Sequence, residues 1–319
     1  MNSNTLIVIT TGIKSNQRST NETYGYGPSN EQLFSYLLFD ALSVGFDRFV
    51  FIVRKSKLKE LKQQVNNKLQ NNIKSHFVID NYFSQQQQAN PKPRGNANQL
   101  LLCKGFVKGP FFVINSDSFY GRNTFKAALQ FLRRNKRNIA AFTNNLYNTL
   151  PYYGKVNRGI CFKNNKTQLL SKVWEIHDIF KDARGNYKFH GPKEYPGVLE
   201  DNLNVTVGAF CLQPKIIEII GAMVASAKNG NKQYSITEIL KVIVQFTDIP
   251  VETIKMKSKF FDARFKSGQI MLTHKIEALV ENGEYPLVLF KKQPHSSVRH
   301  SLKRLFHYLG WKSQVFSLD

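Results

Sequence analysis

The feature that most constrains the fold is an alternation of short apolar runs with longer amphipathic segments along most of the chain. Runs with the β-branched and aromatic content of buried strands occur at residues 5–9, 49–53, 111–114, 139–143 and 205–211. Between them, residues 31–43 and 236–246 carry apolar side chains at helical spacing. Such alternation is typical of a parallel sheet covered by helices. We therefore predict an α/β fold of three layers, with a mostly parallel twisted sheet flanked by helices.

The chain divides into a long body and a short basic tail. Residues 1–290 contain no segment with the composition of a linker, so we predict one domain there. In residues 291–319, apolar residues at helical spacing alternate with basic ones, and these apolar residues are Val298, Leu302, Leu305, Phe306 and Leu309. This amphipathic tail is either a terminal helix that docks on the body or a helix that binds a membrane surface or a partner.

The charge of the chain favours anionic ligands. It has 45 Lys and Arg against 22 Asp and Glu, a formal net charge of +23. Such a surface attracts phosphates, nucleic acid or anionic membranes. The basic residues are dispersed, with clusters at 55–62, 133–137, 255–266 and 291–304. This dispersal argues against nucleic-acid binding as the main role.

Cysteine usage and the distribution of apolar residues bear on the compartment. No apolar run approaches the roughly 20 residues of a membrane-spanning helix, and residues 1–5 lack the basic and apolar regions of a secretory signal. The three cysteines, Cys103, Cys161 and Cys211, lie far apart and form no metal-binding pattern. We expect a cytoplasmic protein with buried, reduced cysteines, and the sequence leaves its oligomeric state open.

Several short blocks occur in an order that resembles one known family. Residues 10–31 read TTGIKSNQRSTNETYGYGPSNE, and residues 92–97 read KPRGNA. Further along, the blocks are VINSDSFYG at 113–121, GKVNRGIC at 154–161 and IEALVENGEYP at 276–286. Together they resemble the nucleotidyltransferase family that makes nucleotide sugars. The resemblance covers about residues 5–290 and implies a Rossmann-like nucleotidyltransferase fold.

The resemblance also implies a reaction and a set of site residues. In the family's chemistry, a phosphorylated sugar or similar acceptor attacks an NTP and pyrophosphate leaves, with Mg²⁺ and cationic side chains on the phosphates. Asp117 ends a predicted buried strand, where α/β sheets place ligands, and is the expected Mg²⁺ ligand, with a plain strand-end cap as the structural alternative. The matching blocks assign nucleotide binding to Thr11, Gly12, Gly95 and Asn96, and acceptor binding to Asn157 and Arg158. For Arg158, a salt bridge within its loop is the structural alternative.

The phosphate loop departs from the family's pattern. Lys14 stands in place of a glycine, and Asn16 in place of an arginine. Losing one preorganised charge donor costs roughly 3–4 kcal/mol in the transition state. We predict that Lys14 and the nearby Arg18 supply the catalytic cations, with solvated loop charges as the alternative. The family's second metal contact corresponds to residues 204–206, which read Asn-Val-Thr and contain no carboxylate, and Asp201 lies just before them but out of register.

Two functions therefore remain open at the level of the sequence. One is a Mg²⁺-dependent nucleotidyltransferase in nucleotide-sugar biosynthesis, whose partners are an NTP and a phosphorylated small-molecule acceptor. The other is a catalytically impaired relative that binds a nucleotide or sugar phosphate as a binding or regulatory protein.

Overall fold

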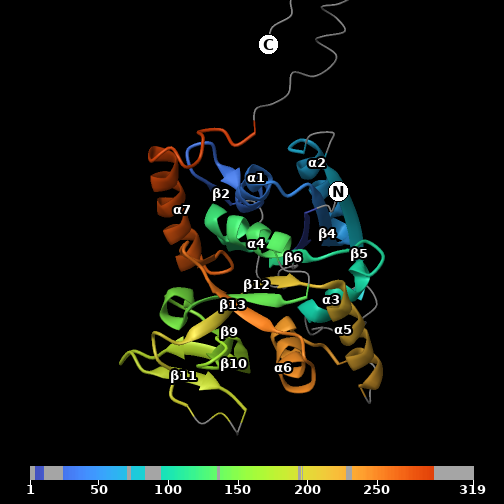
Figure 1. Ribbon diagram of the computed structural model, residues 1–319. Coiled ribbons are helices and arrows are strands. Elements are labelled where there is room, and N and C mark those ends of the chain that lie inside the picture. The colour runs from blue at the N-terminus through green and yellow to red at the C-terminus, as the bar shows by residue number, and fades with distance from the viewer. Residues whose placement is uncertain are drawn as a thin grey trace, which may run out of the picture. The chain divides into compact units, whose positions relative to one another are not determined.

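A mixed sheet of ten strands forms the centre of the computed structural model (Figure 1). The structure describes residues 4–10, 24–69, 73–82, 95–134, 137–192, 195, 197–227 and 232–290, and the counts below refer to these residues. Residues 1–289 form one unit, and the second unit, residues 290–319, lies almost wholly outside the described residues. The predicted tail and the predicted boundary after residue 290 therefore stay predictions.

The elements are as follows. The strands of the large sheet are β1 (Thr5–Ile9), β4 (Arg48–Arg54), β5 (Lys74–Asp80), β6 (Phe111–Asn115), β8 (Ile139–Asn145), β9 (Val156–Lys163), β10 (Leu170–Lys181), β11 (Tyr187–His190), β12 (Asn204–Leu212) and β13 (Val251–Lys255). Two short pairs stand apart, β2 (Gly25–Tyr26) with β3 (Glu31–Gln32) and β7 (Ser118–Phe119) with β14 (Phe261–Asp262). The helices are α1 (Leu33–Val44), α2 (Leu58–Asn66), α3 (Asn96–Leu100), α4 (Arg122–Arg134), α5 (Pro214–Ser226), α6 (Ile236–Phe246) and α7 (Lys266–Glu281).

The sheet has a parallel half and an antiparallel half. Strands β6, β1, β4 and β5 are parallel neighbours in that order, and β13 runs parallel to β8. Strand β12 runs antiparallel to β6, β8 and β9, and β9, β10 and β11 extend this side. The predicted α/β fold is confirmed. Strands β9, β10, β11 and β13 of this sheet were not predicted from the sequence.

Helices cover both faces of the parallel half. Successive side chains of a strand point to opposite faces, so a strand that is apolar throughout, such as β1, needs helices on both sides. On one face, the ring of Phe34 from α1 lies 5.7 Å from that of Phe51 in β4. On the same face, the ring of Phe125 from α4 lies 5.8 Å from that of Phe112 in β6. On the other face, Ile7 and Ile9 join a core cluster with residues of α3, α5 and α6, including Ala97, Leu100, Ile216, Ile217, Ile239 and Leu240. Strand β1 is therefore buried on both sides, as its uninterrupted apolar sequence requires.

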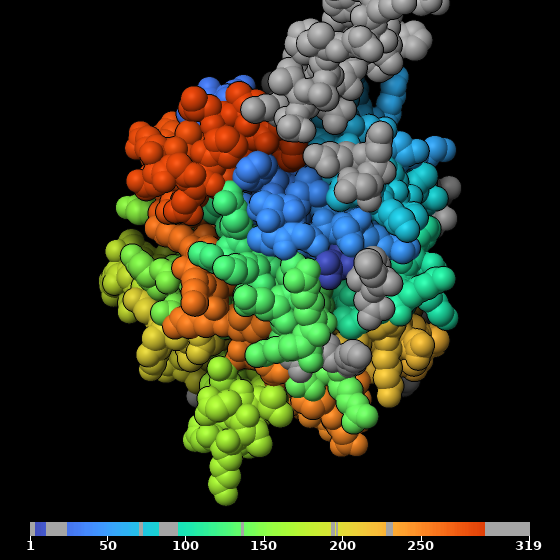
Figure 2. Space-filling view, turned by 45° about the horizontal axis from the view of Figure 1, so that its top comes forward, coloured from blue at the N-terminus to red at the C-terminus, as the bar shows by residue number. Residues whose placement is uncertain are grey.

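The last segment of the body returns to the end of β6. Strand β14 pairs with β7, which follows β6, and the Ala263 N–H donates to the Asp117 carbonyl at 2.9 Å. From there α7 leads back to α1, and Figure 2 shows the red segment of α7 beside the blue segment of α1. Tyr285 fixes this return, since its hydroxyl donates to the Asp40 carboxylate at 2.7 Å. Residues far apart in the sequence thus meet at one edge of the sheet. Among the helices of the described residues, none combines the length and apolar composition that a bilayer crossing requires.

Candidate functional site

Asp117 lies at the carboxyl edge of the parallel strands, where the sequence predicts it. It lies two residues after the end of β6, and the N–H of the intervening Ser116 donates to the Ile9 carbonyl at the end of β1, at 3.0 Å. The Ser118 hydroxyl donates to the Asp117 carboxylate at 3.1 Å. The Asp117 side chain is 11% exposed. This carboxylate is therefore held beside the point where β1 leads into the predicted phosphate loop.

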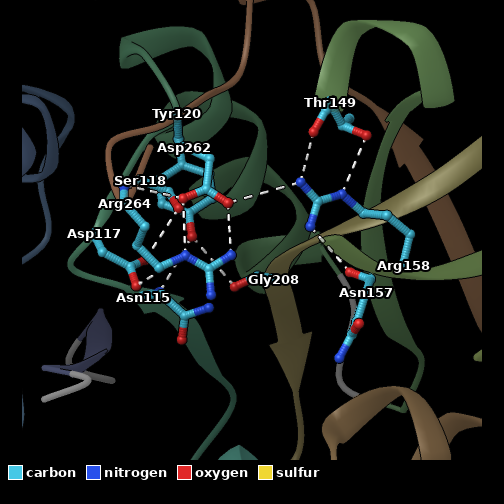
Figure 3. A network of polar contacts seen from close by, with 10 residues as sticks. All are labelled: Asn115, Asp117, Ser118, Tyr120, Thr149, Asn157, Arg158, Gly208, Asp262 and Arg264. Carbon is cyan, nitrogen blue, oxygen red and sulfur yellow. Dashed lines mark hydrogen bonds and ion pairs between the residues drawn. The ribbon is translucent and has the colours of Figure 1, made fainter. Parts of the chain in front are cut away.

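A second carboxylate and a guanidinium reach Asp117 from β14. Arg264 holds Asp262 bidentately, with its Nε 2.8 Å from one carboxylate oxygen and a terminal nitrogen 2.6 Å from the other. The Arg264 Nε also lies 3.6 Å from the Asp117 carboxylate. Figure 3 shows the guanidinium between the two carboxylates. The Asp262 side chain is 5% exposed, whereas that of Arg264 is 48% exposed.

Arg158 supports Asp262 from the interior. Its guanidinium donates to the Thr149 hydroxyl at 3.1 Å, to the Thr149 carbonyl at 2.7 Å and to the Asn157 carbonyl at 3.0 Å. A terminal nitrogen lies 3.8 Å from the Asp262 carboxylate. Burial lowers the pKa of Arg158 to about 10, although the charge of Asp262 opposes this. The buried Arg158 thus orients Asp262, and its assignment to an acceptor phosphate stays a prediction.

The four residues Asp117, Arg158, Asp262 and Arg264 form what we call the strand-end network (Figure 3). Burial tends to raise the pKa of the Asp262 carboxyl, but the hydrogen bonds and charge of Arg264, with the charge of Arg158, hold it below its ordinary value. Both carboxylates are therefore paired with guanidinium groups. Two negative and two positive side chains give the network no net charge.

The donor set does not fit the Mg²⁺ ion that the resemblance implies at Asp117. Mg²⁺ needs free carboxylate oxygens and near-octahedral space for its water and phosphate ligands. Here a bidentate guanidinium occupies both oxygens of Asp262 and faces Asp117. The described residues also contain no group of three or more His, Cys, Asp or Glu side chains placed to hold a metal ion. Asp117 as a metal ligand is therefore not supported by its surroundings.

The predicted nucleotide-binding residues divide into two groups. Thr11, Gly12, Lys14 and Arg18 lie outside the described residues, and their roles stay predictions.

Gly95 and Asn96 contact the segment before α6. The Gly95 N–H donates to the Gln233 side chain at 3.1 Å, and the Asn96 side-chain oxygen accepts the Ile236 N–H at 2.7 Å. A side chain on Gly95 would place its Cβ 2.2 Å from the Tyr234 carbonyl, so this close approach requires glycine. Both residues thus tie α3 to α6, and their role in nucleotide binding stays a prediction.

The second carboxylate beside Asp117 lies outside residues 204–206, where the resemblance places the second metal contact, and it could not be assigned from the sequence. Residues 204–206 belong to β12 and pair with β8, and the Thr206 hydroxyl accepts the Gly159 N–H at 3.2 Å. The carboxylate that reaches Asp117 is Asp262. The signal that could have found it is the pattern Phe-Phe-Asp-Ala-Arg at residues 260–264, an acidic and a basic residue placed just before a helix.

Asn157 is the other predicted acceptor residue. Its side-chain oxygen accepts the Asp178 N–H at 3.0 Å, which connects β9 to β10. Asn157 is exposed, whereas the neighbouring Arg158 is buried. The structure therefore brings Asp117 and Arg158 into one network and leaves Asn157 at the surface beside it.

Known proteins resemble this chain in fold but not in sequence. No protein-family model and no curated protein sequence matches the chain. An inositol-1-phosphate CTP transferase from T. maritima aligns over 86% of this chain and 96% of its own, with 15% identity and a TM-score of 0.58. A UDP-glucose pyrophosphorylase complexed with UDP-glucose aligns over 86% and 99%, with 15% identity and a TM-score of 0.57. HddC from Yersinia pseudotuberculosis, complexed with GMP-PN, aligns over 86% and 99%, with 14% identity and a TM-score of 0.53. At these identities the likeness concerns the fold alone.

Proposed function

We propose that this chain, which has the fold of the sugar-phosphate nucleotidyltransferases, binds a nucleotide or a sugar phosphate at the strand-end network as a binding or regulatory protein. The observation that carries the proposal is that both carboxylates of the network are paired with arginine. Fold alone does not decide function, whereas these side chains determine what the site can bind.

The network is suited to receive a phosphate. Arg264 is 48% exposed, and its guanidinium has five N–H donors, of which the bidentate pair with Asp262 uses two, so the others can donate to a phosphate. Its position is fixed because Asp262 holds it and Arg158 holds Asp262. A donor held in place before the ligand arrives loses less entropy on binding. The net charge of +23 further favours the approach of anions.

The same arrangement disfavours metal-dependent transfer. Nucleotidyl transfer places extra negative charge on the phosphates, and the resemblance implies a divalent cation that balances this charge. To bind there, such a cation would have to displace a bidentate guanidinium from a side chain that is 5% exposed.

A second candidate function is transfer of a nucleotidyl group from an NTP to a phosphorylated sugar or similar acceptor, with release of pyrophosphate. The position of Asp117 at the carboxyl edge of β6 favours it. Catalysis would then depend on the predicted cations Lys14 and Arg18, which lie outside the described residues.

One panel of ligands tests both candidates. The full chain is incubated with each common NTP and a set of sugar phosphates in the presence of Mg²⁺, and pyrophosphate release and the thermal midpoint are measured. We expect no pyrophosphate and an increase in the midpoint with at least one ligand, because a ligand that binds the folded state stabilises it.

A matched pair of variants locates the binding. Arg264→Ala removes the exposed guanidinium of the network, whereas Arg184→Ala removes an exposed arginine on the turn between β10 and β11. The thermal shift is expected to fall with the first change and to persist with the second. Pyrophosphate release that Asp117→Ala abolishes would establish the second candidate, and the absence of any thermal shift across the panel would refute binding.

A further inference from the structure

We infer that the guanidinium of Arg264 takes the place of a divalent cation between Asp117 and Asp262, so that a phosphate ligand binds this site without metal. The statement about the ligand rests on the proposed function. The statement about the cation rests on the geometry of the network alone.

The distances place the guanidinium where a shared cation would lie. Its Nε is 2.8 Å from the Asp262 carboxylate and 3.6 Å from that of Asp117. The two carboxylates come from separate parts of the chain and converge because β14 pairs with β7. Converging carboxylates repel each other unless a cation lies between them. Figure 3 shows that Arg264 meets this requirement.

The charge of the network matches that of a metal site. Two carboxylates with one divalent cation are neutral, and so are two carboxylates with two guanidinium groups. Arg264 lies between the carboxylates, and Arg158 approaches Asp262 from the buried side at 3.8 Å. The chain therefore supplies from its own side chains the positive charge that a metal ion would bring.

The local backbone holds Arg264 in this position. The Arg264 N–H donates to the Asp262 side chain at 3.2 Å, and the Ala263 N–H donates to the Asp117 carbonyl at 2.9 Å. On the other side, the Gln269 side chain donates to the Ala263 carbonyl at 2.9 Å. The guanidinium is covalently attached to this turn, so it is present at the carboxylates at a very high effective concentration. A free metal ion must compete with it for the same carboxylate oxygens.

Removing the guanidinium should therefore create a metal site. In Arg264→Ala, the carboxylates of Asp117 and Asp262 would face each other with no cation between them. Carboxylate oxygens with water are suitable ligands for Mn²⁺. We expect Arg264→Ala to bind Mn²⁺ alone at least about tenfold more tightly than the full-length wild-type chain, whose binding should be too weak to saturate over the range in which the variant saturates.

Two further variants make the Mn²⁺ experiment specific. The double variant Asp117→Ala with Arg264→Ala should lose the gained site, and Arg184→Ala should behave as wild type. Calorimetry with Mn²⁺, together with the electron paramagnetic resonance signal of free Mn²⁺, measures the binding. If Arg264→Ala no longer melts cooperatively, Arg264→Gln takes its place, since it keeps a neutral donor beside Asp262 and carries the same expectation.

The outcomes separate this inference from the proposed function. Wild-type chain that binds Mn²⁺ as tightly as Arg264→Ala, or a folded Arg264 variant that gains no Mn²⁺ binding, would overturn the statement about the cation. For the ligand, the thermal shift produced by a nucleotide or sugar phosphate should be equal in EDTA and in Mg²⁺, and a shift that requires Mg²⁺ would overturn metal-free binding. If no ligand produces a shift, the proposed function fails while the Mn²⁺ result still decides the role of Arg264.

Discussion

The buried carboxyl of Asp40 predicts a dependence of stability on pH. Asp40 lies on α1, is 1% exposed, accepts the Tyr285 hydroxyl at 2.7 Å and lies 3.3 Å from Arg122. Burial raises its pKa from 3.8 to about 7, and the hydrogen bond from Tyr285 and the charge of Arg122 oppose this only in part. Between these two pH values the folded chain keeps a proton that the unfolded chain releases.

The sign and the size of the effect follow from this difference. Where the folded state binds more protons than the unfolded state, a rise in pH lowers the free energy of unfolding. Each pH unit between the two pKa values contributes about 1.4 kcal/mol. For Asp40, the free energy of unfolding should therefore decrease by about 4 kcal/mol as the pH rises from near 4 to near 7.

Urea unfolding across this range measures the effect. Asp40→Asn is the informative variant, because an amide of similar size does not titrate. The difference in unfolding free energy between wild type and Asp40→Asn should change by about 4 kcal/mol over the range, and all other carboxyl groups cancel in this difference. A difference that is constant with pH would show that Arg122 and Tyr285 keep Asp40 ionised, and the reasoning from burial would be wrong.

Two further predictions concern the strand-end network and the turn that forms it. Arg158→Met should lower the free energy of unfolding by about 1–3 kcal/mol, because it leaves the buried Thr149 without its hydrogen-bond donor and Asp262 with Arg264 alone. Arg184→Ala should lower it by less than about 0.5 kcal/mol in the same urea titration. Gly268→Ala should cost about 1–3 kcal/mol, since its Cβ would lie 2.1 Å from the Asp262 carbonyl, whereas Gly105→Ala, where a Cβ meets nothing within 4 Å, serves as the control in the same thermal melts.

The parallel half of the fold could be predicted because its strands are buried on both faces. In the sequence, strands such as β1 and β4 then appear as continuous apolar runs, which are too short for a buried helix. Strand β10 was missed for the opposite reason. Its exposed and buried positions are mixed, with Lys172 exposed beside the buried Val173, and its register with β9 is irregular at two points. A half-exposed, bulged strand leaves no run of apolar residues in the sequence.

The candidate site divides along a similar line. Asp117 could be predicted because it closely follows a buried apolar strand, and the ends of such strands are the usual place for ligands. Asp262 belongs to β14, a strand of two residues that no periodicity can reveal, and Arg264 follows that strand. Their proximity to Asp117 depends on the pairing of β14 with β7. Tertiary structure, and not local sequence, therefore completes the network.

The alternation of side chains along β9 explains why Arg158 lies in the interior. Val156 and Ile160 are buried, and Asn157 is exposed. Residues two apart on a strand share a face, so Arg158 faces the interior with Val156 and Ile160. The network therefore runs from the interior to the surface. The buried Arg158 forms an ion pair with Asp262, Asp262 accepts hydrogen bonds from Arg264, and Arg264 is 48% exposed to solvent. A phosphate that enters this edge of the sheet should therefore contact Arg264 first, and Arg158 should act on the ligand only through the carboxylate between them.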